Sequence, residues 1–382
     1  MKTNLKKLLY SGVTLMSLGV LAACSSTSSS TTSSSVTTSQ SSTTSSNSTS
    51  SDSSSSSIDW SALPTTEVTL SNDGLKITEG GTYILTGSTT AGVTVETDAN
   101  VRIILAGSDI SSSDTAAINV ISADNVELEI QDGTSNTVKD TSSHSDTNIE
   151  GAIHVEADLT ITGNGNLTVE GNFQDGIVST DDLVINAGNI TVTAVDDGIR
   201  GKDSLTINGG TINVTAGGDG IKSTNDTDTT KGYTTITGGE ITVKAGDDGI
   251  KAETALTIDG GTITVSESLE ALEGTNITIN GGTLDVYGSD DAINAASTTS
   301  SDIFIKVTGG DLKVAVGSGD TDAFDANGDI YISGGTIDVT APTSAFDFDG
   351  TVEFTGGTVT VNGEQITQIT ATGPGAGGHG GW

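Results

Sequence analysis

Short runs in which apolar and polar residues alternate recur along the chain from about residue 60 onward. Leu205-Thr206-Ile207 and Thr211-Ile212-Asn213-Val214 are two examples, and the pair Gly209-Gly210 lies between them. Alternation with a period of two predicts β-strands with one buried face, and a glycine pair between two runs predicts a tight turn. The chain is therefore expected to consist of short strands joined by turns.

These runs repeat in a fixed frame, which is marked by an apolar residue after an Asp-Gly or a related dipeptide, as in Asp196-Asp197-Gly198-Ile199. The apolar anchors are spaced by 22, 22, 29, 22, 21, 31 and 22 residues: Ile177, Ile199, Ile221, Ile250, Leu272, Ile293, Phe324 and Phe346. Ile118 and Ile153 fit the same frame. A unit of about 22 residues with two or three strands is typical of one coil of a solenoid. We therefore expect an all-β protein, a right-handed parallel β-helix; a β-sandwich or adhesin module would lack this register.

Three longer stretches interrupt the frame, at Thr224–Tyr233, Ala296–Ser301 and Asp132–Glu150. They are expected to be insertions that project from single coils. The glycine pairs are expected to occupy turns with positive φ, and an outward Thr column (Thr206, Thr235, Thr257, Thr278) fits ordinary strand propensity.

Acidic residues occupy one position of the repeat in seven successive units, two residues before each anchor: Asp175, Asp197, Asp219, Asp248, Glu270, Asp291 and Asp322. A second acid precedes three of them: Asp196, Asp247 and Asp290. Equivalent positions of stacked coils lie about 4.8 Å apart. Two unit charges at that spacing repel by about 3.5 kcal/mol at an effective dielectric near 20.

Such a row requires either protonated members or hard cations between the acids. Carboxylates and turn carbonyls are the ligands that calcium prefers, and the small residue after each acid is expected to open the backbone to an ion. The calcium candidates are the following: Asp175, Asp196, Asp197, Asp219, Asp247, Asp248, Glu270, Asp290 and Asp291. The alternative is that these are turn residues whose side chains cap local amides.

Basic residues stack one position after the anchor in three successive coils, at Arg200, Lys222 and Lys251, with Lys202 close by. One interpretation is charge balance for the acids. The other is a groove that binds an anionic polysaccharide through these cations and bridging calcium.

The charge of the whole chain limits its partners. With 50 acidic and 14 basic residues the formal net charge is −36, which excludes nucleic acid as a partner because phosphate binding needs a basic face. The three His residues, His144, His154 and His379, show no zinc-binding spacing.

The first residues have the pattern of a removable signal peptide, with Lys2, Lys6 and Lys7 followed by a short apolar stretch. Leu21-Ala22-Ala23-Cys24 resembles a lipobox, in which the cysteine, here Cys24, receives lipid. We expect a signal peptide over residues 1–23, a Ser/Thr-rich tether over 24–57, a β-helix body over 58–370 and a Gly-rich tail over 371–382. The expected location is the extracellular face of the cell membrane of a Gram-positive-like cell; an ordinary secreted protein is the alternative.

The repeated Asp-Asp-Gly-Ile-Lys motif (as at Asp247–Lys251), the Asn-Gly-Gly-Thr-Ile turn (Asn208–Ile212) and the lipobox together resemble the bacterial carbohydrate-binding domain-containing lipoproteins. The resemblance covers roughly residues 60 to 365. It implies a calcium-loaded β-helix with a pectate-lyase-like fold that binds plant cell-wall polysaccharides without clear catalytic activity. It also implies that the matching aspartates form the calcium shell. Leu269-Glu270-Ala271-Leu272 and the chain beyond Thr321 depart from the motif.

The sequence thus predicts a calcium-dependent protein that binds acidic, pectin-like or cellulose-like polysaccharides. One alternative is a calcium-dependent polyuronate lyase in which Lys222, Lys251 or Arg200 abstracts the proton. A structural surface adhesin is the other alternative.

Overall fold

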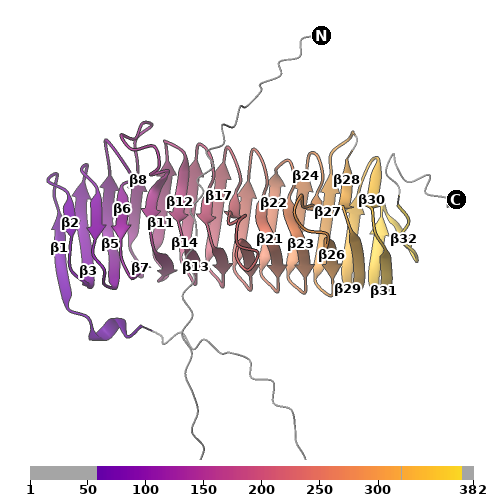
Figure 1. The fold of residues 1–382 in the computed structure, drawn as a ribbon, viewed down its shortest axis with the longest axis horizontal. Coiled ribbons are helices and arrows are strands. Elements are labelled where there is room, and N and C mark those ends of the chain that lie inside the picture. The colour runs from indigo at the N-terminus through magenta and orange to yellow at the C-terminus, as the bar shows by residue number, and fades with distance from the viewer. Residues whose placement is uncertain (1–57, 320, 372–382) are drawn as a thin grey trace, which may run out of the picture. The chain divides into compact units, whose positions relative to one another are not determined.

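The computed structural model describes residues 58–319 and 321–371. Figure 1 shows their coils stacked along one axis, from β1 at one end to β31 and β32 at the other. The strands of successive coils pair in parallel, and in the described residues only the last pair, β31 with β32, is antiparallel. The expected fold class, a parallel β-helix, is confirmed.

Each regular coil contributes one strand to each of three parallel ladders. The first ladder contains the ends of β3 (Gly81–Thr89) and β5 (Val101–Ser111), β8 (Ser135–Lys139), β11 (Asn166–Gly171), β14 (Asn189–Ala194), β17 (Thr211–Ala216), β20 (Glu240–Lys244), β22 (Thr262–Glu267), β24 (Thr283–Gly288), β27 (Asp311–Val316) and the ends of β29 (Asp329–Thr340) and β31 (Val352–Val361).

The second ladder begins at the apolar anchors and contains β2 (Leu75–Ile77), β4 (Val93–Glu96), β6 (Ile118–Ser122), β9 (Gly151–Val155), β12 (Asp175–Ser179), β15 (Ile199–Gly201), β18 (Ile221–Ser223), the starts of β21 (Ile250–Ile258) and β23 (Leu272–Ile279), β25 (Ile293–Ala295), β28 (Asp322–Ala326) and β30 (Ser344–Phe348). The third contains β1 (Thr65–Leu70), the starts of β3 and β5, β7 (Asn125–Ile130), β10 (Asp158–Thr162), β13 (Asp182–Ile185), β16 (Ser204–Ile207), β19 (Tyr233–Ile236), the ends of β21 and β23, β26 (Phe304–Val307) and the starts of β29 and β31. A 3-10 turn, η1 (Trp60–Ala62), precedes β1, and β32 (Glu364–Ile366) ends the described strands.

The core is one continuous column of aliphatic side chains inside the coils. The predicted anchors pair with one another from coil to coil, as Ile177 with Ile199 and Ile199 with Ile221. All of the anchors are buried, and the last two, Phe324 and Phe346, stack with ring centroids 5.1 Å apart. Because each coil buries its apolar face only against its neighbours, the stack as a whole supplies the hydrophobic stabilisation.

The glycine pairs meet the expectation of positive φ at their second member only. Gly210 has a φ of +97°, whereas Gly209 has no such φ. A Cβ on Gly209 would instead lie 2.9 Å from the carbonyl oxygen of Asn186 in the preceding coil. The first glycine of the pair is therefore required by the close stacking of coils and the second by the turn itself.

One of the three insertions is shorter than the sequence predicted. Residues 135–139 of the expected Asp132–Glu150 insertion form β8, which pairs in register with β5 and β11. The projecting segment there is 140–150, while residues 224–232 and 296–303 project as expected. The prediction was wrong at β8 because Ser135–Lys139 lies between two turns and lacks a glycine pair to mark it.

Within residues 58–371, no helix is long and apolar enough to cross a membrane. The predicted signal peptide, Cys24 and the tether lie outside the described residues, as do His379 and all but the first residue of the predicted tail.

Candidate functional site

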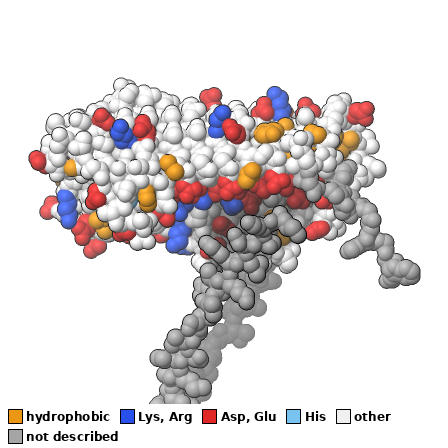
Figure 2. Space-filling model, turned by 90° about the horizontal axis from the view of Figure 1, so that it is seen from above, with side chains coloured by type: hydrophobic (Ala, Val, Ile, Leu, Met, Phe, Trp, Pro, Cys, Tyr) orange, Lys and Arg blue, Asp and Glu red, His pale blue; other side chains and the backbone are white. Residues whose placement is uncertain are grey.

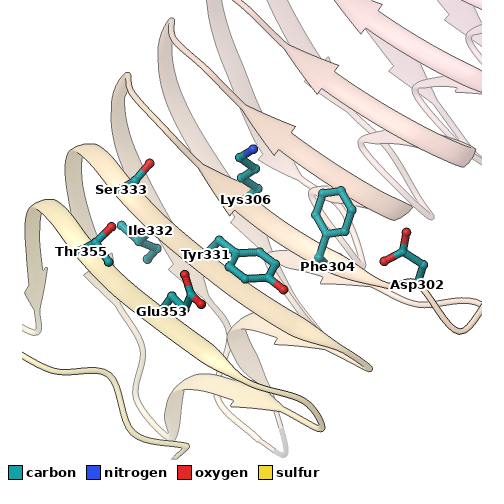
Figure 3. A pocket seen from close by; sticks show the side chains of 8 residues that line it. All are labelled: Asp302, Phe304, Lys306, Tyr331, Ile332, Ser333, Glu353 and Thr355. Carbon is teal, nitrogen blue, oxygen red and sulfur yellow. The ribbon is translucent and has the colours of Figure 1, made fainter.

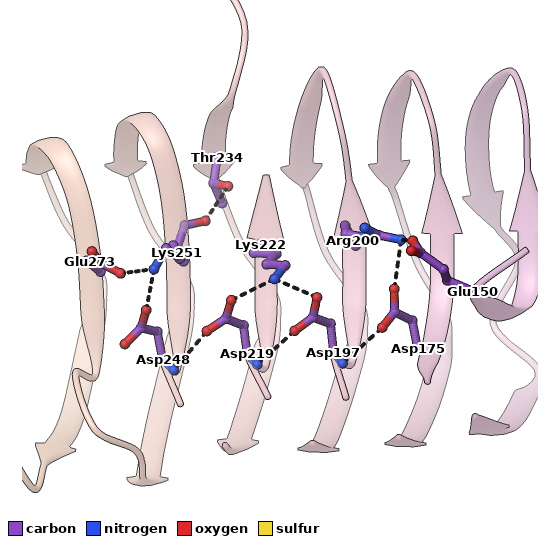
Figure 4. Close-up of polar contacts among 10 residues, drawn as sticks. All are labelled: Glu150, Asp175, Asp197, Arg200, Asp219, Lys222, Thr234, Asp248, Lys251 and Glu273. Carbon is purple, nitrogen blue, oxygen red and sulfur yellow. Dashed lines mark hydrogen bonds and ion pairs between the residues drawn. The ribbon is translucent and has the colours of Figure 1, made fainter. Parts of the chain in front are cut away.

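Four of the predicted acids form a buried ladder at the turn between the first and second strand ladders. Asp175, Asp197, Asp219 and Asp248 are each no more than 5% exposed. In each of the first three, the Oδ1 atom accepts a hydrogen bond from the backbone N–H of the next aspartate. The N–O distances are 3.1, 3.0 and 2.9 Å (Figure 4). One carboxylate oxygen of each of the first three acids thus stabilises the turn of the following coil.

The basic column supplies the partners of the second carboxylate oxygens. The Nη2 atom of Arg200 lies 2.8 Å from Asp175 Oδ2, and Arg200 also pairs with Glu150. Lys222 Nζ lies 2.6 Å from Asp197 Oδ2 and 2.9 Å from Asp219 Oδ2. Figure 4 shows these cations in a row directly beside the row of acids.

The third cation of the row has the same arrangement. Lys251 Nζ lies 2.7 Å from Asp248 Oδ2 and also pairs with Glu273. Only 20 to 26% of the side-chain surface of Arg200, Lys222 and Lys251 is exposed. Because their charged groups point at buried carboxylates, the geometry favours charge balance over a groove of free cations. Lys202 is exposed and stands apart from the row.

The cationic row ends at Lys251, because the residues that follow it in the same register are Glu273, Asn294 and Asp325. Burial and the nearby Asp248 raise the pKa of Glu270 to about 9 and that of Glu273 to about 8. Burial and neighbouring carboxylates likewise raise the pKa of Asp325 to about 7. Glu273 keeps one basic partner, Lys251, whereas Glu270 and Asp325 form no ion pair with a basic residue of the described chain. The raised pKa values favour the protonated form of these carboxyl groups.

The outer acids Asp196, Asp247 and Asp290 are exposed, whereas Asp291 is half-buried and accepts the N–H of Asp322 at 2.7 Å. One oxygen each from Asp219, Asp247 and Asp248 lie within 4.8 Å of one another, the one such group of three among the described residues. It brings together three of the nine predicted calcium ligands.

One atom of this group has an unmet bonding capacity. Asp248 Oδ1 is buried, and no hydrogen-bond donor of the described residues contacts it. Burial opposes ionisation of Asp248, but hydrogen bonds from Glu273, Glu270 and Lys251 hold its pKa below the ordinary value. A water molecule, a proton on a neighbouring carboxyl group or a cation would satisfy this oxygen, and an all-oxygen ligand set suits a hard cation.

The small residues after the acids do not open the backbone to an ion, as the sequence had suggested. A Cβ on Gly220 would point inward and lie 2.3 Å from Val243 Cγ1 and 2.6 Å from the carbonyl oxygen of Gly249. Ala271 and Ala292, at the same position of later coils, are buried. The requirement for a small residue therefore comes from core packing.

A cleft of about 760 Å³ lies between the two insertions 224–232 and 296–303. Its lining includes Tyr233, Lys251, Glu253, Glu273 and Asn276, and the hydroxyl side chains of both insertions. The sequence located both insertions but not the cleft, because the pattern does not show that loops separated by 63 residues face each other across the two coils between them. The shared position of the two insertions, both directly after a second-ladder strand, was the available signal.

Two of the histidines have structural partners. His144 is buried, stacks on Phe173 with centroids 4.4 Å apart, and places its Nε2 atom 3.0 Å from Asp140 Oδ2. His154 is also buried, and burial together with nearby Arg200 lowers its pKa to about 4. His144 therefore joins the 140–150 insertion to the adjoining coil, whereas His154 is a buried residue of β9.

Comparison with known proteins points to one family. The sequence model for carbohydrate-binding domain-containing proteins matches residues 71–323. A carbohydrate-binding domain-containing protein of Acetivibrio thermocellus is 38% identical over 135 residues, which are 33% of this chain and 47% of the relative. The match thus spans about half the length of that curated relative.

A solved structure has a similar fold. It is that of a polysaccharide lyase-like protein from C. thermocellum, a gadolinium derivative, and it is similar with a TM-score of 0.53 at 33% sequence identity. The similarity covers 57% of this chain and 95% of that one.

Removing one cation of the row tests its role in charge balance. Lys222→Met keeps much of the aliphatic stem but leaves Asp197 and Asp219 buried without their cation. We expect the free energy of unfolding to fall by about 3 kcal/mol, the typical effect of removing one partner of a buried ion pair. Chemical denaturation measures this. Lys202→Met, at the exposed lysine, is the matched control and should change stability by less than about 0.5 kcal/mol. Equal effects of the two substitutions would contradict charge balance.

The raised pKa of Glu270 makes stability depend on pH. The unfolded chain releases this proton near 4.5, but the folded protein retains it until about 9. The stability that Glu270 contributes is therefore complete below pH 4.5 and is lost as the pH rises through 9. In chelator, Glu270→Gln should match the wild type at the acidic end and exceed its unfolding free energy by about 1–2 kcal/mol at the alkaline end, after allowance for solvent screening.

Denaturation curves over this pH range measure the difference. The exposed Glu267→Gln is the control and should follow the wild-type profile. If Glu270→Gln also follows it, Glu270 does not hold a proton in the folded protein.

Proposed function

Because this chain belongs to the carbohydrate-binding domain-containing protein family, we propose that it binds a polysaccharide in the cleft between its two insertions, with calcium held by Asp219, Asp247 and Asp248. Family membership and the lyase-like fold of the solved relative support carbohydrate binding in general. The position of the cleft beside an all-carboxylate group supports the more specific assignment.

The lining of the cleft suits a polymer of sugars. Hydroxyl groups of Thr229, Thr230, Thr254, Thr298 and Thr299 border it, together with serine and asparagine side chains. Such groups both donate and accept hydrogen bonds, as sugar hydroxyls do. Its volume lies within the usual range of ligand sites, and few convergent polar groups on a rigid scaffold are what such sites need.

The oxygen ligands of the carboxylate group are of the kind that calcium prefers. Three carboxylates supply hard oxygen ligands, and the buried Asp248 Oδ1 accepts no hydrogen bond from the described residues. Lys251 links this group to the cleft, since it pairs with Asp248 and also lines the cleft. A cation bound by Asp247 would therefore lie near the edge of the glycan site.

The charge of the cleft determines which glycans need calcium. Asp226, Asp228, Glu253 and Glu273 line it against one cation, Lys251. Without a bound cation this surface repels a polyuronate, and calcium would neutralise it and bridge to the sugar carboxylates. A neutral, cellulose-like chain needs no such bridge. Calcium dependence is therefore expected for acidic, pectin-like glycans.

A calcium-dependent lyase is the second candidate, favoured by the lyase-like relative. The residues that sequence reasoning offered as its base do not suit proton abstraction. Burial opposes the charge of Lys222 and of Lys251, but the paired carboxylates raise the pKa of both above the ordinary value. A general base needs a pKa near the working pH. A binding protein is the better assignment.

Attachment to the outer face of the cell membrane through lipid on Cys24 is part of the proposal. Its support is the lipobox at Leu21–Cys24 and the Ser/Thr-rich stretch that follows. Two acyl chains on one residue are sufficient for stable anchoring.

Asp247→Asn tests the calcium site. Asp247 is exposed, and its side chain makes no hydrogen bond to the buried ladder. Removing its charge should therefore leave the melting temperature in chelator unchanged. We expect calcium affinity to fall by at least about tenfold, because the site loses one of three charges, and calcium-dependent binding of oligogalacturonate to weaken with it. Calorimetric titration of calcium and of oligogalacturonate into the chelated full chain measures both.

Asp290→Asn is the matched control, an exposed acid at the same position of a later coil but outside the carboxylate group. Calcium binding that is equally strong in both variants would contradict this ligand set. A gain of ultraviolet absorbance from unsaturated product during the oligogalacturonate titration would instead indicate the lyase.

Cys24→Ser tests the anchor. In a Gram-positive host the full chain should partition with the membrane and incorporate labelled palmitate, and the variant should appear in the medium without label. If the variant stays with the membrane, lipid on Cys24 is not the anchor.

A further inference from the structure

The outward face of the third strand ladder changes character near its C-terminal end. The Thr column pairs from coil to coil, Thr206 with Thr235, then Thr257 and Thr278. In the next coils the same register holds Lys306, Tyr331 and Glu353. A face of small hydroxyl side chains is thus replaced by large ones over three coils.

Two aromatic rings lie together on this face. Phe304 and Tyr331 occupy diagonal positions of β26 and β29, with ring centroids 6.3 Å apart at an angle of 66°. The Tyr331 hydroxyl donates a hydrogen bond to Asp329 Oδ2 at 2.6 Å, which fixes the direction of the ring. We call these two rings the aromatic platform.

The platform forms part of a hollow of about 400 Å³, and Lys306, Ser333, Glu353 and Thr355 line the rest of it. Figure 3 shows the tyrosine and phenylalanine rings on adjacent strands, with Glu353 on one side and Lys306 on the other. One apolar surface with polar groups around its rim is the usual composition of a small-molecule site.

The core of the helix does not require these rings. Ile305, Ile330 and Ile332, the inward neighbours on the same strands, are buried and complete the core there, whereas Phe304 and Tyr331 are half-exposed. The chain has only six Phe, five Tyr and two Trp, so two outward rings in contact are a concentration of a scarce residue type. Aromatic side chains with a polar handle are favoured where a surface must bind a partner.

The platform borders the proposed glycan cleft. Asn276, which lines the cleft, pairs directly with Phe304. Asp302, which lines the hollow, lies in the same 296–303 insertion that walls the cleft. One polymer could therefore contact both places.

We propose that Phe304 and Tyr331 form a stacking subsite for the ring face of a neutral pyranose unit, a proposal that rests on the proposed function of polysaccharide binding. The rings offer the apolar face, and Lys306, Glu353, Ser333 and Thr355 bond the equatorial hydroxyls. The rim carries one cation, Lys306, against two carboxylates, Glu353 and Asp302, so its charge does not favour a uronate. Binding here therefore needs no calcium, unlike binding of an acidic glycan in the cleft.

The test uses the full chain in chelator with cellohexaose as the probe, measured by calorimetry. Phe304→Ala and Tyr331→Ala should each weaken binding at least about tenfold, as expected for aromatic anchors of an interface. Tyr331→Phe keeps the ring and should stay within about threefold of the wild type. Tyr287→Ala, at an exposed tyrosine of the first strand ladder, is the matched control and should bind as the wild type does.

The outcomes separate this proposal from the proposed function. A wild type that does not bind cellohexaose in chelator, or alanine variants that bind it normally, would overturn the platform. Calcium-dependent binding of oligogalacturonate should persist in both alanine variants. Melting temperatures show whether each variant is folded, and Tyr331→Leu, which retains an apolar side chain of similar reach, should weaken binding as the alanine variant does.

Discussion

Parallel backbone hydrogen bonds hold equivalent residues of successive coils one strand spacing apart, about 4.8 Å. Side chains at the same position of successive coils therefore form a column along the helix. For Ile177, Ile199 and Ile221 the column is favourable, since the coils bury one another's apolar faces. For Asp197 and Asp219 the same geometry places like charges side by side, so the spacing that builds the core also creates repulsion between carboxylates. Figure 2 shows a band of acidic side chains that runs along the helix axis on the surface.

Two kinds of compensation divide the helix. Up to Lys251 each buried aspartate has an amide hydrogen bond, a basic partner or both, and Lys222 serves two of them. Beyond Lys251 the basic column is replaced by Glu273, Asn294 and Asp325, and the pKa of Glu273 and of Asp325 is raised. A buried carboxylate without a partner is costly. Protons or bound cations would neutralise those carboxylates, such as Glu270 and Asp325, that form no ion pair with a basic residue of the described chain. The carboxylate group of Asp219, Asp247 and Asp248 lies where the basic column ends.

The sequence was sufficient for the fold and for the columns, because both follow from a period that can be counted. The sequence did not predict the direction in which the charged side chains point. Arg200 and Lys251 occupy the register that the spacing predicted, but whether they reach toward solvent or fold back onto Asp175 and Asp248 depends on burial that no spacing reveals. The strand β8 was also not recognised, and the coils before Ile118 were expected within the body but were not aligned, although Leu75 follows Asp73-Gly74 and stands in the anchor register.

The candidate sites lie where the repeat is broken. A regular coil presents the same short polar side chains as its neighbours and forms no hollow, as the Thr column illustrates between Thr206 and Thr278. The insertions 224–232 and 296–303 form the walls of the cleft. In the coils after Thr278, the rings of Phe304 and Tyr331 provide an outward apolar surface. In both places the pairing of the strands shifts only locally, at Ala252–Ala255 and at Ile332–Thr336, and the parallel ladders continue beyond, so the stack tolerates these departures. A solenoid can therefore acquire binding surface one coil at a time, and residues that depart from the column in which they stand are the ones in which to look for function.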